Sequence, residues 1–384
     1  MLAILCFAAA GFLLLLALHP FIFYPLSLRV LARFHQRPLR ASAESETEPL
    51  SYAVCVCAYN EAAIIRTTIE SLIALRETTP NLQILLHVDG TGDGTADIAQ
   101  EYADRIDLVI SPERKGKTYG MNRLMTLARA SVVILTDATV RIDPQAIPNL
   151  GRYFRDPQVG CVAGHLRYVN DETTTAMVGS FYWRLEERIK ELESATGSIM
   201  GADGSIYAIR RSLFTPVPED MIDDMYISLA VLCDGYRIVR APDVYAYEKS
   251  VTDTSEEFRR KIRISCQAFA AHRFMRPKLA RLSRLDRYKY MSHKLIRWFT
   301  AYTLTAAALF FFIGLGLTLG PIVAAGITVA GLAVLALGYF VGLRPVTAAT
   351  DILASFVATA IGVWKASNGH RIRVWEPASS IRKA

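Results

Sequence analysis

The residues best suited to chemistry in this 384-residue chain stand at the ends of predicted strands. Asp137 closely follows the apolar run 132–135, which is typical of a strand buried on both faces of a sheet. Ligands of open α/β sheets bind beyond the carboxyl ends of the strands, so Asp137 is placed to meet a metal or a nucleotide. The alternative is that Asp137 only caps a turn.

Three more motifs end or follow predicted strands. The motif CAYNE ends the first strand at Glu61, DGTGDGT ends the second over 89–95, and KGK follows the third over 115–117. Each motif alone is weak, because Gly-Asp turns are common and a lone KGK is usually a solvated loop. The carboxyl ends of parallel strands share one edge of a sheet, so we expect all four motifs to converge there.

The elements that would position these motifs alternate between strand and helix. We expect strands over 53–60, 83–89, 108–110 and 131–135, separated by helices over 61–75, 95–102 and 119–129. This alternation predicts an α/β fold with a doubly wound, mainly parallel sheet.

The composition also indicates that the chain is associated with a membrane. The chain is 52% hydrophobic and carries a net charge of +7, and its apolar residues gather at the N-terminus and after residue 296. Arginines follow the first apolar segment, so the positive-inside rule places the α/β domain in the cytoplasm, at an inner or plasma membrane. The six cysteines include no CxxC pair and give no zinc pattern.

We therefore predict seven segments. They are an N-terminal transmembrane helix (1–30), a cytoplasmic linker (31–50), the α/β domain (51–254), basic amphipathic interfacial helices (255–295), two transmembrane helices (296–343), an interfacial, re-entrant or third apolar helix (344–364) and a cytoplasmic tail (365–384). A lipid surface explains the basic stretch, so we expect membrane lipid as a partner and no nucleic acid.

At these motifs the chain resembles the membrane-bound family 2 glycosyltransferases, which have the A-type nucleotide-sugar transferase fold. The resemblance covers roughly residues 52–263. It implies a pocket around the nucleoside base formed by Ala58, Tyr59, Glu61 and Asp89. It also implies that Lys117 approaches the diphosphate of the donor.

The resemblance further implies a divalent cation, Mg2+ or Mn2+, held by the DxD motif that begins at Asp137. Thr139 replaces the second aspartate of this motif, so one of the two expected ligands is neutral.

The adjacent acids Asp223 and Asp224 look like the ED segment of the family, in which the second acid is the general base. Asp224 would then deprotonate an acceptor hydroxyl, while Asp223 orients Asp224 or caps the helix. The loop Gly201, Ala202, Asp203 and Gly204 would line the path of the acceptor, although an ordinary loop before a strand is equally consistent with its sequence.

One departure from the family bears on the product. Processive synthases of the family carry QxxRW after the ED segment, and only Arg263 matches here, as a further nucleotide-sugar-binding residue. Ile264 stands where a tryptophan would stack on the acceptor sugar. This favours transfer of one or a few sugars over processive synthesis.

The sequence thus predicts a membrane-anchored inverting glycosyltransferase. It would move a sugar from a nucleotide-sugar, a UDP-sugar by our expectation, to a lipid-linked or glycan acceptor in surface polysaccharide or glycolipid assembly. Two alternatives stay open. They are a processive synthase with a degenerate QxxRW motif, and a catalytically silent nucleotide-binding scaffold, which Thr139 permits and Asp224 argues against. The sequence does not indicate an oligomeric state.

Overall fold

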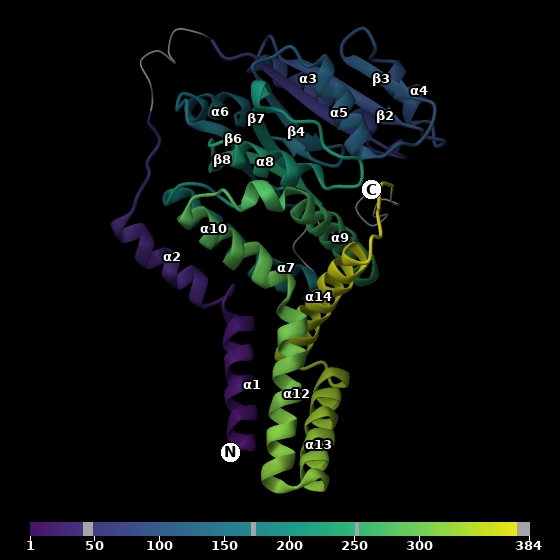
Figure 1. The fold of residues 1–384 in the computed structure, drawn as a ribbon. Coiled ribbons are helices and arrows are strands. Elements are labelled where there is room, and N and C mark those ends of the chain that lie inside the picture. The colour runs from purple at the N-terminus through teal and green to yellow at the C-terminus, as the bar shows by residue number, and fades with distance from the viewer. Residues whose placement is uncertain (41–48, 170–173, 250–252, 375–384) are drawn as a thin grey trace.

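The structure, a computed structural model, describes residues 1–40, 49–169, 174–249 and 253–374. Within these residues it has an eight-stranded sheet with the strand order β3-β2-β1-β4-β7-β6-β8-β5, covered by helices on both faces (Figure 1). A group of apolar helices extends from one side of this α/β domain.

One half of the sheet is parallel, as the alternation of strand and helix predicts. It consists of β3 (Asp107–Ser111), β2 (Gln83–Asp89), β1 (Tyr52–Ala58) and β4 (Val132–Asp137). Successive residues of β1 face opposite sides and are buried on both, which explains its continuous apolar run. The four carboxyl ends share one edge, so the predicted convergence of the motifs is confirmed.

The other half of the sheet contains strands of both directions, so the sheet as a whole is mixed. This half consists of β7 (Ile206–Arg210), β6 (Val159–Tyr168), β8 (Arg237–Glu248) and the short β5 (Arg141–Ile142). β7 and β5 run opposite to β4, whereas β6 and β8 run in the same direction as β4. β7 runs antiparallel to β4 because the chain enters it from the carboxyl edge, where Thr136 Oγ1 donates to the carbonyl of Ser205 at 2.5 Å. The loop before β7 therefore lies beside Asp137.

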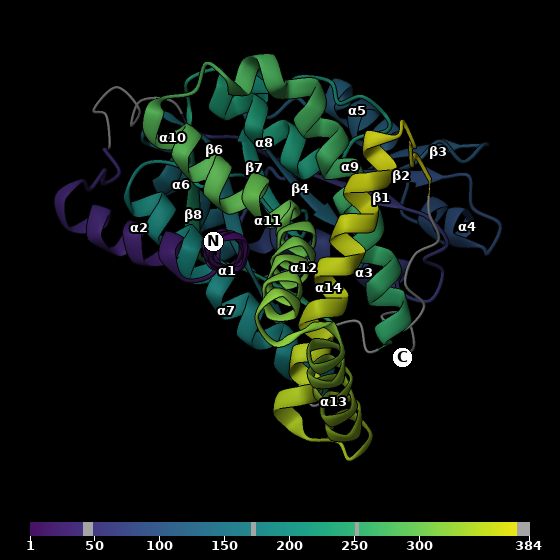
Figure 2. The same cartoon turned by 60° about the horizontal axis from the view of Figure 1, so that its bottom comes forward.

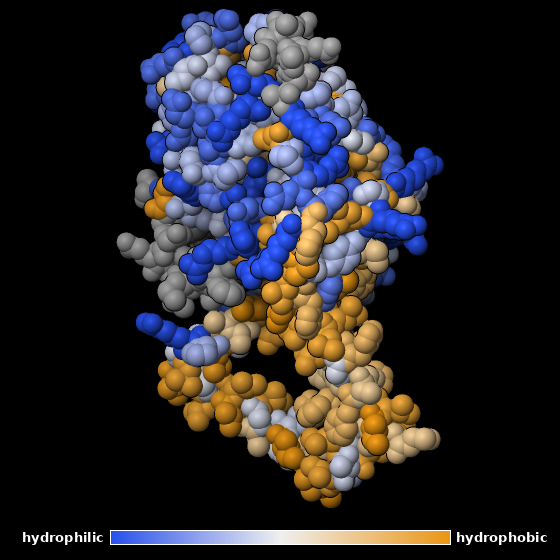
Figure 3. Space-filling view, turned by 90° about the vertical axis from the view of Figure 1, so that its left-hand side faces the viewer, coloured by the Kyte–Doolittle hydropathy of each residue, from blue (hydrophilic) through white to orange (hydrophobic). Residues whose placement is uncertain are grey.

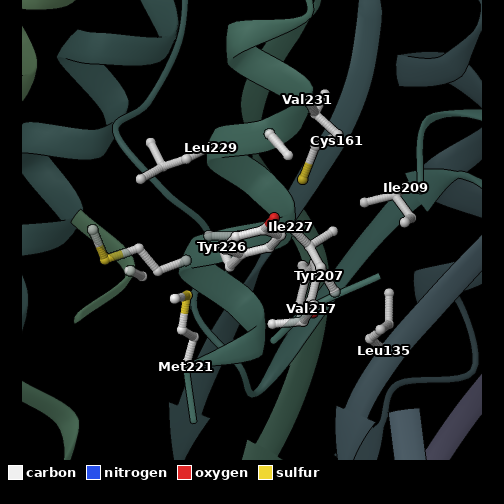
Figure 4. Close-up of a cluster of buried hydrophobic side chains, with 14 of the residues drawn as sticks. Leu135, Cys161, Tyr207, Ile209, Val217, Met221, Tyr226, Ile227, Leu229 and Val231 are labelled. Atoms are coloured by element: carbon white, nitrogen blue, oxygen red, sulfur yellow. The ribbon is translucent and has the colours of Figure 1, made fainter. Parts of the chain in front are cut away.

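Helices bury the two faces of the sheet. One face packs against α5 (Lys117–Leu127), α8 (Asp223–Cys233) and α9 (Thr254–Leu279). The other packs against α3 (Ile65–Ala74), α4 (Thr95–Gln100) and α6 (Ala146–Phe154). Figure 4 shows the first core, where Ile227 and Val231 of α8 meet Cys161, Tyr207 and Ile209 of the strands.

The remaining helices lie toward the apolar side of the molecule. They are α1 (Leu2–Leu18), α2 (Phe23–Phe34), α7 (Thr174–Ala195), α10 (Arg284–Tyr290), a π-helical turn (Met291–Leu295), α11 (Ile296–Trp298), α12 (Thr300–Leu319), α13 (Pro321–Phe340) and α14 (Arg344–Ser367). Two short 3-10 turns complete the fold, at Leu75–Glu77 and Arg211–Leu213.

Among the described residues, α12, α13 and α14 are long and apolar enough to cross a membrane. The pair α1 and α2 passes the same length and composition test when it is taken as one broken span with a 57° bend. Apolar side chains cover this part of the molecule, whereas charged and polar ones cover much of the α/β domain (Figure 3).

The N-terminal segment differs from the single helix that we predict over 1–30. It breaks after Leu18, and Pro20 and Pro25 explain the break, because proline disrupts a helix interior but is tolerated in a first turn. α2 then lies against α7 and buries Tyr24 and Leu28. Of the predicted linker and tail, residues 41–48 and 375–384 lie outside the described part.

The last apolar segment is one continuous helix, α14, that runs alongside α9 (Figure 2). A Cβ at Gly362 would come within 2.5 Å of the Ile262 carbonyl oxygen, so only glycine allows this close approach of the two helices. Lys261 Nζ also donates to Ser355 Oγ at 2.6 Å. α9 therefore packs between the α/β domain and α14, and its residues 265–271 are buried.

A buried polar network ties the N-terminal helices to the rest of the chain. Glu193 of α7 accepts hydrogen bonds from the hydroxyl of Tyr24 (2.5 Å), Nδ1 of His293 (2.8 Å) and the amide of Met200 (3.1 Å). The other ring nitrogen of His293 faces Glu186 at 2.9 Å. Both nitrogens thus meet carboxylates, an arrangement that the doubly protonated imidazolium satisfies.

We expect Glu193→Ala to destabilise the protein by about 3–5 kcal/mol, because it leaves the buried Tyr24 and His293 without their shared partner. Thermal unfolding of the detergent-purified chain should show a Tm lower by several degrees. Glu191→Ala is the matched control on the same helix, since the exposed Glu191 forms a surface ion pair with the exposed Arg188. Equal losses of Tm in the two variants would contradict this account.

Candidate active site

Lys117, the first residue of α5, lies at the centre of the candidate site. Its Nζ is 2.7 Å from Oδ1 of Asp137 at the end of β4 and 3.3 Å from Oδ2 of Asp223 at the start of α8. Its side chain is 18% exposed. Burial would lower the pKa of Lys117, but the two carboxylates outweigh burial and raise it, so the ammonium stays charged.

Asp224 adjoins this ion cluster in the first turn of α8. Its Oδ1 accepts a hydrogen bond from the amide of the next residue, Met225, at 2.5 Å, whereas the N-cap position of α8 is Ile222, which makes no side-chain cap bond. Burial, followed by the charge of Asp223, raises the pKa of Asp224 to about 7, while Lys117 acts in the opposite direction. A carboxylate that titrates near neutrality can accept a proton from a substrate.

The loop that we predict to line the acceptor path lies against this acid. A Cβ at Gly204 would be 3.0 Å from Oδ2 of Asp224, so glycine leaves room there. The amide of Ala202 donates to Ser228 Oγ at 3.0 Å, and Ser228 Oγ donates to the carbonyl of Asp224 at 2.7 Å. This chain of bonds links the loop to the base candidate.

The other members of the loop make separate contacts. Gly201 has a φ of 110°, a left-handed conformation that favours glycine. Asp203 forms an ion pair with Lys190 of α7, which also contacts Glu187 at 3.0 Å. The loop is thus anchored to α7 on one side and to α8 on the other.

Asp89 shapes the KGK loop. Its two carboxylate oxygens accept hydrogen bonds from the amides of Lys115 (2.8 Å) and Gly116 (2.7 Å), and its side chain is buried. Gly116 has a φ of 95° and precedes the first turn of α5. Asp89 therefore holds the backbone that positions Lys117 beside Asp137 and Asp223. The sequence did not indicate this role.

The CAYNE motif lies at the same edge. Ala58 is buried at the end of β1, and the amide of buried Glu61 donates to Thr95 Oγ1 at 2.9 Å. The guanidinium of Arg114 lies 3.7 Å from the ring centroid of Tyr59. The ring of Tyr59 is therefore paired with a cation at the position where we predict the nucleoside base.

Arg263 of α9 interacts electrostatically with the acidic cluster. Burial, and then Arg260, lower its pKa to about 10, while Asp137 and Asp224 act to raise it. Its NH1 donates to Oε1 of Gln267 at 3.3 Å. The structure thus brings Arg263 within electrostatic range of the residues that carry the predicted chemistry.

The side chains at the DxD position suit a hard divalent cation. Asp137 has a side chain that is 41% exposed, and a cation, the Lys117 ammonium, already contacts it. Carboxylate and hydroxyl oxygens are the donors that Mg2+ and Mn2+ prefer. Thr139, however, donates its hydroxyl to Oε1 of Glu248 at 2.5 Å. Among the described residues, no three His, Cys, Asp or Glu side chains cluster as a ready-made metal site.

The segment 370–373, which follows α14, reaches this edge and was missed by the sequence analysis. The carbonyl of Ile372 accepts a hydrogen bond from Gln267 (2.8 Å), and Arg371 pairs with Asp220 (3.0 Å). A Cβ at Gly116 would lie 2.5 Å from the carbonyl oxygen of Arg373. The only signal in the sequence is the pair of arginines, which reads equally well as a membrane-flanking charge.

Comparison with solved structures identifies the fold. The fold is similar to that of a mannosyltransferase from Pyrobaculum calidifontis solved with GDP-Man and Mn2+, with a TM-score of 0.73 over 94% of this chain and 99% of that one, at 20% identity. The chain therefore has the A-type glycosyltransferase fold.

Residues 53–216 match the family model of glycosyl transferase family 2, and the chain carries a domain of that family. The resemblance drawn from the motifs is thereby confirmed.

Two curated relatives illustrate how far the likeness extends. An N-acetylglucosaminyltransferase of Rhizobium sp. (strain N33) is 25% identical over 51% of this chain and 48% of its own length. A hyaluronan synthase of Streptococcus pyogenes is 27% identical over 47% and 45%, respectively. The chain thus spans about half the length of the curated relatives that it matches.

Gly116→Ala should release the segment 370–373, because the new methyl group would meet the carbonyl of Arg373. We expect trypsin to cleave the folded protein faster after Arg371. Mass spectrometry of the fragments measures this rate. Gly94→Ala is the control, since Gly94 has a similar φ of 92° but no atom within 4 Å of a Cβ. Each variant pays about 1 kcal/mol of backbone strain. The same cleavage rate in both would show that strain alone is responsible.

Proposed function

We propose that this chain is a membrane-anchored, inverting glycosyltransferase. It transfers a sugar from a nucleotide-sugar, by our proposal a UDP-sugar, to a hydroxyl of a lipid-linked or glycan acceptor in surface polysaccharide or glycolipid assembly. The observation that carries this proposal is the position of Asp224, a carboxylate with a raised pKa, beside the Lys117–Asp137 ion pair.

The donor diphosphate would lie at the carboxyl edge of the parallel strands. Lys117 is a partly buried cation there, and on meeting the diphosphate it would neutralise charge that develops on the leaving group. Asp137 and Thr139 would hold Mg2+ or Mn2+, which supplies further positive charge to the phosphates. Ala58, Tyr59, Glu61 and Asp89 would surround the base, and Arg263 would contact the donor from α9.

The base would act on the acceptor. Asp224 takes the proton of the acceptor hydroxyl while that oxygen attacks the anomeric carbon and the nucleoside diphosphate departs. This single displacement inverts the configuration of the sugar. Asp223 stays paired with Lys117 and orients its neighbour, and the residues Gly201, Ala202, Asp203 and Gly204 line the approach.

The apolar helices would anchor the enzyme. The lengths and exposed apolar side chains of α12 and α13 support two membrane crossings, and the arginines of α2 support a cytoplasmic α/β domain at an inner or plasma membrane. The contact of α14 with α9 supports an interfacial position for α14 rather than a third crossing. This position would keep the active site close to a lipid-linked acceptor.

A processive polysaccharide synthase is the second candidate, which the similarity to a hyaluronan synthase favours. Ile264 in place of the stacking tryptophan supports the shorter product. Chromatography of the product separates the two, because a processive enzyme releases long polymers early whereas single transfer extends every acceptor by one or a few sugars.

Asp224→Asn should lower turnover at least about 100-fold, because the amide cannot accept the proton. The Kd for the nucleotide should stay within about twofold, since the base acts only in the chemical step. A transfer assay measures turnover, and isothermal titration calorimetry measures the Kd for the nucleotide. Asp234→Asn, at the exposed far end of the same helix, is the control and should leave both unchanged. Parallel loss of binding and turnover would instead make Asp224 structural.

The rate should also depend on pH with a defined sign. The pKa of Asp224 is raised to about 7, so the acid is protonated and inactive below that pH. We expect kcat/KM to rise with pH and to level off above neutrality, in assays at saturating metal. A profile that is flat from acidic to neutral pH, or that falls as the pH rises, would contradict the assignment of the base.

A further inference from the structure

The position of Thr139 in the DxD motif brings a distant acid to the metal site. Glu248 is 109 residues away in the sequence, yet its Oε1 accepts the hydroxyl hydrogen of Thr139 at 2.5 Å. An aspartate at position 139 would carry its own carboxylate in this direction. The structure therefore places a carboxylate one hydrogen bond beyond the point where the usual motif has one.

Two strand pairings fix Glu248 in this position. β5 begins two residues after Thr139 and pairs antiparallel with β8, matching Arg141 to Tyr247 and Ile142 to Ala246. This register brings the next residue of β8, Glu248, level with the residues that precede β5. On its other side, Glu248 pairs with Tyr168 of β6, and its carbonyl accepts the amide of Val169 at 3.1 Å.

The carboxylate of Glu248 retains an oxygen for a ligand. Thr139 donates to Oε1, which is the only hydrogen bond or ion pair that the described residues make with this carboxylate. The negative charge of Asp137 acts on Glu248, as do the positive charges of Arg260 and Lys117. Glu248 therefore lies within electrostatic range of the Lys117–Asp137 ion pair.

We propose that Glu248 is a ligand of the divalent cation that the proposed function assigns to Asp137. The pair of carboxylates that the usual motif supplies from one strand end comes here from two strands, β4 and β8. Thr139 orients Glu248 through its hydroxyl, as residues behind a metal ligand commonly do. This inference rests on the proposed function, and it explains how a neutral residue can stand in the motif without loss of the second charge.

The test is the binding of Mn2+ to the full chain in the presence of saturating UDP. Electron paramagnetic resonance detects the bound Mn2+. Glu248→Gln keeps the shape of the side chain and an acceptor for Thr139 but removes the charge. We expect it to weaken Mn2+ binding about tenfold or more, and Asp137→Asn to weaken it similarly. Glu101→Gln, an exposed acid remote from the site, should bind Mn2+ as the unmodified chain does.

A second variant separates loss of a ligand from loss of folding. Thr139→Asp in the Glu248→Gln background returns a carboxylate to the site from the other strand, and it should recover most of the Mn2+ affinity. Recovery requires that the first substitution left the fold intact.

Two results would overturn the proposal in distinguishable ways. Unchanged Mn2+ binding in Glu248→Gln, combined with loss in Asp137→Asn, would leave the metal site standing and exclude Glu248 from it. Absence of Mn2+ binding by the unmodified chain with UDP bound would remove the metal from the proposed function itself.

Discussion

The ion pairs of the partly buried Lys117 ammonium are the interactions on which the candidate active-site edge depends. Asp137, Asp223 and Asp224 come from two different elements, and their negative charges would repel one another without a cation between them. Removing one partner from such a cluster leaves an uncompensated buried charge, which is costly. Asp89 and the left-handed Gly116 hold the backbone that presents Lys117, so residues that never touch the acids still determine their arrangement.

The mixed sheet explains why the site lies where it does. The parallel half brings the CAYNE, Asp89, Lys117 and Asp137 motifs to one edge, as open α/β sheets do with nucleotide ligands. The reversal at β7 then brings the loop 201–205 to the same edge from the other half. In the proposed function, the donor binds over the parallel strands, and the acceptor meets the base where the two halves of the sheet join.

The sequence was most informative where a local pattern carries the signal. The apolar strand runs and the polar residues that end them were enough to predict the parallel half, its shared edge and the family. Glu248 could not be found in this way, because its relation to Thr139 depends on the pairing of β5 with β8 across more than a hundred residues. The segment 370–373 was missed for the same reason, since its contacts with Gly116 and Gln267 are tertiary. The break after Leu18 is marked by prolines, but the burial of Tyr24 against α7 that fixes α2 is not visible in the sequence.

In the proposed function, this site releases a nucleoside diphosphate as it transfers a sugar to an acceptor. The most direct test of this function is to offer the detergent-purified chain a panel of nucleotide-sugars, with Mn2+ and a lipid extract as acceptor, and to measure nucleoside diphosphate release. We expect release from one class of donor, dependent on both metal and lipid. Bound nucleotide without release from any donor, in the presence of both, would contradict it and leave a protein that binds nucleotides without catalysis.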